Sequence, residues 1–179
     1  MLKKMRGFTL IELLIVVAII GILAALLIPN ALEAIQKAKQ KSAMKEIMSV
    51  STAAADYITD HGDWSLAIHD GDLAQADNFV TAVATFYLKI CPINDPWNTP
   101  YKVYTGQAAV TGLMTGANSG DIGADDFAVQ SFGRDKAAGP LQASTYNTST
   151  PEAGFYNVSK MADFNNDLVC WNGNWVVGP

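Results

Sequence analysis

The chain has 179 residues, half of them apolar and 16% charged, which is enough for one ordinary domain and a short additional segment. This length excludes a large multidomain enzyme. The net charge of -5 is unevenly divided: residues 1–45 carry seven Lys and Arg against two Glu, whereas residues 46–179 carry five basic and 15 acidic residues. Because the larger part is acidic and has no Lys/Arg cluster that could follow a phosphate backbone, we expect no nucleic-acid binding.

A basic leader and an apolar helix are predicted at the amino terminus. Three basic residues precede Gly7, and Thr9 and Glu12 are the only strongly polar side chains in the 21 residues from 8 to 28. A helix of that length measures about 32 Å and can cross a hydrocarbon core of about 30 Å. We expect a single membrane span. The positive charge before it favours a cytoplasmic amino terminus and a head on the far side.

Glu12 is the residue that a simple membrane anchor does not explain, because a carboxylate within a span costs up to about 2.5–3.5 kcal/mol. Cleavage after Gly7 would give Phe8 a free α-amine four residues from Glu12, in the same chain or in a neighbour. A helix amino terminus also attracts negative charge. The alternative is that the Glu12 side chain extends to the lipid headgroups.

Residues 3–20, with the sequence KKMRG followed by FTLIELLIVVAII, closely resemble the amino terminus of type IV prepilins and pseudopilins. In that family a membrane prepilin peptidase cuts after the glycine and methylates the new amino terminus, and the glutamate guides the subunit into a helical filament. The resemblance therefore implies cleavage after Gly7, N-methylation of Phe8 and an assembly role for Glu12. It extends to Pro29, where the family has a helix kink. The implied partners are the peptidase, an inner-membrane assembly platform, minor pilins or pseudopilins, and further copies of this chain.

The helix should continue from residue 29 to about residue 58. Pro29 lacks an amide proton, so we expect a bend or a local opening there. Beyond it, apolar or small residues recur mostly every three or four positions, which predicts one packing stripe: Leu32, Ile35, Ala43, Ile47, Val50, Ala54 and Ile58. The other faces carry lysines that either face solvent or contact lipid headgroups or acidic neighbouring subunits: Lys37, Lys39, Lys41 and Lys45.

The remaining residues, 59–179, should form a small β-rich head. They are rich in Gly, Asn, Asp, Ser and Thr, and their apolar residues come in short bursts, which predicts short strands between polar turns: 79–90, 101–104, 127–132 and 168–177. The run 79–88 fits a helix or a strand. We therefore expect an α+β fold, with a long N-terminal helix and a small antiparallel β-sheet head, which the resemblance makes pilin-like. Its parts are the leader 1–7, the membrane helix 8–28, the helix continuation 29–58 and the head 59–179.

Two segments of the head carry a more specific resemblance. Residues 95–101, DPWNTPY, predict a rigid turn that enters a strand, and they resemble the Asp-Pro-Trp-Gly-x-Pro-Tyr segment of the major pseudopilins of type II secretion, with Asn98 replacing the usual glycine. Residues 129–139, VQSFGRDKAAG, resemble the Ser-Tyr-Gly-x-Asp-Gly-x-x-Gly strand and loop that follows in those proteins, with Lys136 at a usual glycine. Two resemblances in the same order favour a pseudopilin.

Calcium is the cofactor to consider, because the head offers hard oxygen ligands, and alternate positions in residues 163–167 can direct oxygens towards one ion. An EF-hand is excluded, since Leu168 stands where that loop needs glycine. The major pseudopilins that resemble this chain hold calcium in their carboxy-terminal loops. The candidate ligands are Asp163, Asn165, Asp167, Asp125 and Asp126. Ordinary turns capped by these side chains are the alternative.

Cys91 and Cys170 are the only cysteines. An even pair in an exported head favours a disulfide, which would close a loop of about 80 residues. The alternative is two buried thiols. A metal site is disfavoured, because His61 and His69 show no ligand spacing with either cysteine.

The sequence contains no motif of a common enzyme class. It has no Walker loop, no Gly-x-Ser-x-Gly elbow and no His-Glu-x-x-His, and the Gly-rich residues 112–123 do not match a dinucleotide fingerprint. His61, with Asp60 and Asp63, is interpreted as a turn after the long helix.

We therefore expect a filament subunit and not an enzyme. The main hypothesis is a type II secretion pseudopilin that acts in protein export, anchored by a single span in the inner membrane with its head in the periplasm. The alternative is a type IV pilin that forms surface fibres for adhesion or motility. A membrane-tethered periplasmic binding or enzymatic domain is a remote alternative, because a tether would not need Glu12.

Overall fold

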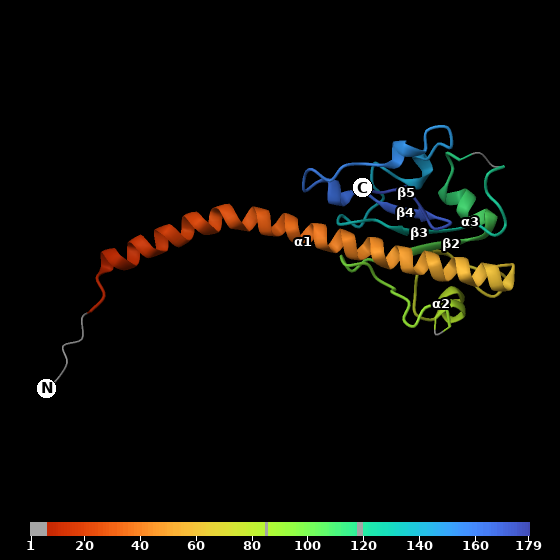
Figure 1. Cartoon of the computed structure of the whole chain (residues 1–179), viewed down its shortest axis with the longest axis horizontal. Coiled ribbons are helices and arrows are strands. Elements are labelled where there is room, and N and C mark those ends of the chain that lie inside the picture. The colour runs from red at the N-terminus through yellow and green to blue at the C-terminus, as the bar shows by residue number, and fades with distance from the viewer. Residues whose placement is uncertain (1–6, 85, 118–119) are drawn as a thin grey trace. The chain divides into compact units, whose positions relative to one another are not determined.

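The computed structural model describes residues 7–84, 86–117 and 120–179 (Figure 1). The predicted basic leader, apart from Gly7, lies outside these described residues. The longest element is the helix α1, Leu10–His61, which has 52 residues. The chain divides into two units, residues 1–36 and residues 37–179, so α1 contributes to both.

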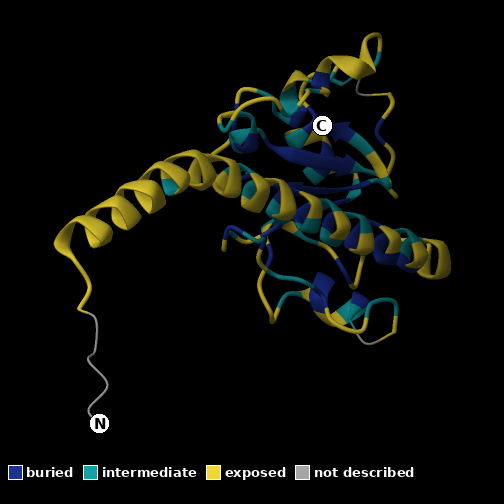
Figure 2. Cartoon of the chain, turned by 60° about the vertical axis from the view of Figure 1, so that its left-hand side comes forward, coloured by how far each residue is buried: buried dark blue, intermediate teal, exposed yellow. Residues whose placement is uncertain are grey.

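In the first unit, α1 exposes its apolar side chains. The large apolar residues between positions 8 and 28 retain 45–81% of their accessible surface, and almost all of this part of α1 is exposed in Figure 2. The helix is long and apolar enough to cross a membrane. It continues through Pro29 without interruption, so the local opening is not observed. A proline removes one helical hydrogen bond, and the neighbouring residues form the remaining ones.

In the second unit, α1 packs against the head through one stripe. The prediction is confirmed for Ala43, Ile47, Val50 and Ala54, which are all 0% exposed, whereas Ile58 is half-buried at the edge of the core. Four further residues of α1 are buried: Gln40, Ser51, Ala53 and Tyr57. Apolar periodicity could not identify the two polar ones. Leu32 and Ile35, which belong to the first unit, are about half exposed.

The helix ends at His61, about one turn later than predicted, so Asp60 and His61 lie in its last turn and the turn after the helix begins at Gly62. Gly62 has φ +77° and its amide donates to the carbonyl oxygen of Ile58 at 2.8 Å. This is the left-handed residue that commonly follows a helix. The His61 ring stacks on Tyr57, with ring centroids 4.2 Å apart. His61 therefore has a structural position at the helix end.

The head contains a five-stranded antiparallel sheet in which the strands follow each other in chain order. The strands are β1 (Asp70–Asp72), β2 (Lys102–Thr105), β3 (Phe127–Ser131), β4 (Leu168–Trp171) and β5 (Asn174–Val177). Four of them fall in or beside predicted apolar bursts, and the α+β class is confirmed. The strand β1 was not predicted, because its sequence Asp-Gly-Asp has no apolar residue.

Short helices fill the connections. The ambiguous run 79–88 begins as the helix α2, Asn78–Val83, and α3, Gly106–Leu113, was not predicted. Three 3-10 turns follow: η1 (Ala143–Thr145), η2 (Pro151–Gly154) and η3 (Asp163–Asn165).

The sheet separates two apolar cores. Alternate residues of each strand point to opposite faces. Val129 and Cys170 therefore face a core that includes α1 and α2, and Val169 faces a second core that includes Val110 of α3. Figure 1 shows α1 and α3 at different sides of the strands.

We predict that Ile47→Ala destabilises the head by about 2–4 kcal/mol, because it removes a completely buried side chain between α1 and the sheet. Ile68→Ala is the matched control: Ile68 is 63% exposed, and its truncation should change the free energy of unfolding by less than about 0.5 kcal/mol. Urea unfolding of the full chain in detergent, followed by tryptophan fluorescence, measures both. Equal effects would contradict this packing arrangement.

Candidate functional site

The start of α1 is held by a reciprocal cap. The Glu12 carboxylate oxygen Oε2 accepts hydrogen bonds from the Thr9 amide at 2.8 Å and the Thr9 hydroxyl at 2.7 Å. The Glu12 amide donates in turn to the Thr9 hydroxyl oxygen at 3.3 Å. This is a capping box, in which two helix-terminal amides find side-chain partners. The Thr-x-x-Glu spacing carried this signal, and our sequence analysis missed it.

The predicted cleavage site precedes this cap. Gly7 and Phe8 are exposed and outside any helix or strand, and Phe8 is 72% exposed. An exposed, non-helical peptide is the form that a peptidase can bind. In the uncleaved chain Phe8 has no free amine, so Glu12 bonds to Thr9. After cleavage, an amine at Phe8 would compete with Thr9 for the same carboxylate. The assignment of these residues to cleavage and assembly stays a prediction.

The apolar surface of α1 that follows the cap must be shielded from water. Each large apolar side chain that leaves water contributes about 1.5–3 kcal/mol, so a helix segment that exposes its large apolar residues on every side is unfavourable in water. Glu12 is the only charged residue within positions 8–28. Lipid or the same segment of other copies can cover this surface, and both are consistent with one chain that is first inserted and later assembled.

In the head, Asp95 organises the first of the two predicted motifs. Its carboxylate is buried and accepts hydrogen bonds from the amides of Trp97 at 3.0 Å and Thr99 at 2.9 Å. The other carboxylate oxygen accepts a bond of 2.7 Å from the Ser131 hydroxyl. Tyr101, at the end of the motif, is completely buried and donates to Glu46 of α1 at 2.7 Å. The rigid turn is confirmed, and it connects α1 with β3.

The second motif, residues 129–139, packs closely against residues 164–167 of the carboxy-terminal segment. Gly133 has φ +70°, and a Cβ atom there would lie 2.7 Å from the carbonyl oxygen of Asn166 and 2.8 Å from that of Phe164, so glycine is required. Further along the loop, Gly139 donates its amide to Asp167 at 2.9 Å. The two motifs that the sequence analysis treated separately therefore meet at the bond between Asp95 and Ser131.

The predicted calcium ligands do not gather around one point in the structure. Asp163 accepts from the amides of Ser159 and Lys160, each at 2.8 Å. Asn165 accepts from the Arg134 side chain at 2.9 Å. The Asp163 carboxylate therefore caps a local turn, and the Asn165 amide oxygen binds the neighbouring loop.

Two of the three remaining candidate calcium ligands also accept hydrogen bonds from other side chains, and the third is exposed. Asp167 is buried and accepts from Gln130 at 3.0 Å, and burial raises its pKa to about 6. Asp126 accepts from Trp171 at 3.1 Å, whereas Asp125 is exposed. Within the described ranges, no group of three or more His, Cys, Asp or Glu side chains could hold a metal ion. The proposed ligand set does not fit, and calcium binding stays a prediction from the resemblance.

The expected disulfide is not formed, which corrects our preference for it over two thiols. Cys91 and Cys170 are both free and buried. Each packs in the apolar core, Cys170 on β4 and Cys91 beside Pro92, to whose carbonyl oxygen its thiol donates at 3.9 Å. Burial raises the pKa of Cys91 to about 11 and also raises that of Cys170, so both thiols stay protonated.

Comparisons with known proteins agree with these features. Residues 2–28 match the family model described as the prokaryotic N-terminal methylation motif. The type II secretion system core protein G of Escherichia coli K12 is 30% identical over 129 residues, which cover 69% of this chain and 88% of that protein. The chain belongs to the type IV pilin-like family, which includes these core G proteins.

Other members of this pilin-like family match this chain over different lengths. Core protein G of Aeromonas hydrophila is 29% identical over 130 residues, or 69% of this chain and 90% of that protein. The type IV major pilin of Myxococcus xanthus is 47% identical, but only over 60 residues, or 34% of this chain and 27% of that pilin. No solved structure matches the chain.

The departures from the pilin-like pattern are compatible with the fold. Asn98 has φ +64° and Lys136 has φ +61°, and both occupy positions where the resembling pseudopilins have glycine. Asparagine adopts this left-handed conformation more readily than most residues. Lysine does so at a cost of about 1 kcal/mol, and Lys136 is exposed, so its side chain meets no obstacle. Both positions therefore adopt the left-handed conformation that glycine favours.

We predict that Asp95→Ala destabilises the head by about 3–5 kcal/mol, because it leaves two amides and the Ser131 hydroxyl without their buried acceptor. Ser131→Ala should cost about 1–2 kcal/mol. The double variant should lose about 1–2 kcal/mol less than the sum, as measured by urea unfolding. Asp125→Ala, at an exposed position, is the control. Strict additivity would contradict the link between the motifs.

Proposed function

We propose that this chain is the structural subunit of a helical type II secretion filament, a pseudopilin that acts in protein export. The observation that carries the proposal is the length of the match: the similarity to core protein G of Escherichia coli extends over 129 residues, 88% of that protein. The alignment is therefore too long for the helix alone and includes the head.

The alternative, a surface pilin for adhesion or motility, has narrower support. The major pilin of Myxococcus xanthus and a fimbrial protein of Pseudomonas aeruginosa match over 60 and 57 residues, about a third of this chain. A match of this length requires only the shared helix. The linked turn and loop of the head, joined through Asp95 and Ser131, also resemble the secretion proteins.

In this proposal α1 takes part in three steps: membrane insertion, cleavage and filament assembly. The precursor is held in the inner membrane by the apolar segment, with its head in the periplasm. Prepilin peptidase cuts between Gly7 and Phe8 and methylates the new amine. The inner-membrane platform then transfers the apolar segment from lipid to the filament, where it packs against other copies while the heads face outward. Minor pseudopilins would belong to the same filament. This role uses packing surfaces and requires no catalytic group.

Deleting the gene in the native organism tests the assignment to secretion. We expect specific proteins to disappear from the exported proteome, measured by mass spectrometry, while surface fibres seen by electron microscopy persist. Complementation with the intact gene is the control and should restore export. Loss of surface fibres with unchanged export would make the chain a surface pilin and overturn the proposal.

We also predict that Glu12→Gln gives an inserted and cleaved protein that does not assemble. Glutamine can keep the cap with Thr9, because the capping box accepts either residue, but it removes the charge that pairs with the Phe8 amine. Losing one partner of a buried ion pair costs about 3–5 kcal/mol, so filament formation should fall more than about 100-fold. Glu33→Gln, elsewhere on α1, is the control. Membrane fractionation, amino-terminal mass spectrometry and filament sedimentation separate the steps. Normal filaments would show that the assigned pairing is wrong.

A further inference from the structure

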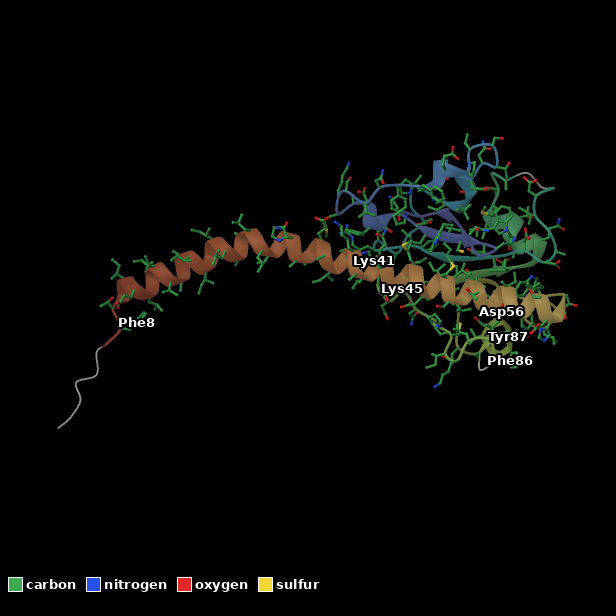
Figure 3. The ribbon with its side chains drawn as sticks, in the orientation of Figure 1. Phe8, Lys41, Lys45, Asp56, Phe86 and Tyr87 are labelled. Atoms are coloured by element: carbon green, nitrogen blue, oxygen red, sulfur yellow. The ribbon has the colours of Figure 1, made fainter. Side chains whose placement is uncertain are left out.

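Near its carboxyl end, α1 forms a depression with two kinds of side chain. The depression has a volume of about 330 Å³ and is lined by Asp56, Thr59, Asp60, Phe86 and Tyr87. The first three belong to α1 and the two aromatic residues belong to the segment after α2. Figure 3 labels Asp56, Tyr87 and Phe86 at this end of α1. We call these five residues the acidic-aromatic pocket.

The aromatic side of the pocket is held in place. The Tyr87 hydroxyl donates to Asp60 at 2.9 Å, and the Tyr87 ring packs edge-on against Tyr57, with ring centroids 5.8 Å apart. Phe86 contacts Tyr87 edge-to-face at 4.8 Å but is 80% exposed. The Phe86 ring thus lies exposed at the surface, beside Tyr87 and the two carboxylates of the pocket.

This combination suits the side chain of a lysine. An ammonium group is attracted by carboxylates and by the face of an aromatic ring, and its aliphatic stem packs on apolar surface. The charged residues that line the pocket are Asp56 and Asp60. The His61 ring lies 3.4 Å from the Tyr87 hydroxyl, and Lys89 follows two residues after Tyr87 on the same segment. Among the described residues, no ion pair is recorded for Asp56 or Asp60. The acidic charge is therefore available to a partner.

The same helix carries matching cations. Lys41 and Lys45 are exposed, and no ion pair is recorded for either of them within the part of the chain that the structure describes. They are four residues apart, as are Asp56 and Asp60. A displacement of 15 residues along the helix therefore brings both pairs to the same height at once, Lys41 level with Asp56 and Lys45 level with Asp60. On a helix this displacement is about 22 Å. Figure 3 shows the two lysines nearer the middle of α1 than Asp56.

We propose that the acidic-aromatic pocket of one copy receives Lys41 and Lys45 of a neighbouring parallel copy, shifted by about 22 Å along the helix. The two surfaces lie at different heights on α1 and do not overlap, so each copy can donate lysines to one neighbour and accept them from another. Such a head-to-tail contact does not close on itself and produces a filament. Neighbours with other offsets remain available for the contact of Glu12.

This inference rests on the proposed function only in requiring that copies assemble, whether inside the envelope or on the surface. It deepens that proposal, because it names a contact that sets the register between heads. The test therefore reads assembly directly, by sedimentation and electron microscopy of filaments, and reads export separately.

The test reverses the charge of each surface in the full chain, expressed in cells that lack the native gene. Lys41→Glu with Lys45→Glu should lower filament yield at least about tenfold, because two attractions become two repulsions. Asp56→Lys with Asp60→Lys should do the same. Lys160→Glu and Glu152→Lys reverse exposed charges elsewhere in the head and should leave the yield unchanged. Thermal melting confirms that each variant head is folded, and the lysine variant alters only exposed positions of α1.

Coexpression of the two reversed variants is the decisive arm. Each keeps one native surface, so copies that alternate would again bring opposite charges together, and filament yield should recover to within about twofold of the parent. Filaments from either variant alone, or failure of the folded variants to recover on coexpression, would overturn the proposal. If reversed variants assemble and export normally while the deletion strain loses export, only the pocket assignment fails. If deletion removes surface fibres instead, the same arms apply to those fibres.

Discussion

The apolar surface of α1 between residues 8 and 28 restricts the environments in which this protein is stable. It exposes large aliphatic side chains on every side. Water is an unfavourable surrounding for such a helix, so its surface has to be covered from synthesis onward. Lipid supplies the first cover, and on the proposed function other copies supply the second. The transfer between them is nearly neutral for aliphatic groups, which leaves the choice to polar groups such as Glu12.

The second half of α1 connects the head to that segment. It buries one stripe against the sheet and leaves the opposite faces polar. The Tyr101 hydroxyl on Glu46 and the Asp95 carboxylate on Ser131 connect α1, the turn and β3 in series. The segment that carries Phe86 and Tyr87 lies between α2 and this turn, so the packing that stabilises the head also fixes the acidic-aromatic pocket. The lysines Lys41 and Lys45 occupy exposed positions of α1, and the pocket lies where the segment with Phe86 and Tyr87 meets α1.

Much of this architecture could be predicted from the sequence. The apolar run, the stripe at Ala43, Ile47, Val50 and Ala54, and four strands carried a periodic or compositional signal. What could not be predicted depended on contacts between distant residues. Periodicity does not report that Gln40 and Ser51 are buried, or that Asp-Gly-Asp pairs with β2 as an edge strand.

The candidate sites show the same limit. The spacing of Asp163, Asn165 and Asp167 suggested one ion, but Asp163 caps a local turn, and the fold brings distant hydrogen-bond donors to Asn165 and Asp167. The count of two cysteines suggested a disulfide, but two small apolar side chains in one core satisfy the same count. By contrast, the turn motifs were recognised correctly because their geometry is local. Their meeting through Asp95 and Ser131 is a tertiary fact.

On the proposed function, the apolar segment of α1 is covered by copies of itself once the leader is removed. The most direct measurement is a cryo-electron microscopy reconstruction of filaments purified with this chain as the main subunit. We expect a central bundle of α1 segments beginning at Phe8, with the heads outside and no lipid layer around the bundle. A reconstruction in which the heads form the centre, or in which the apolar segments remain in lipid and outside the filament, would contradict it.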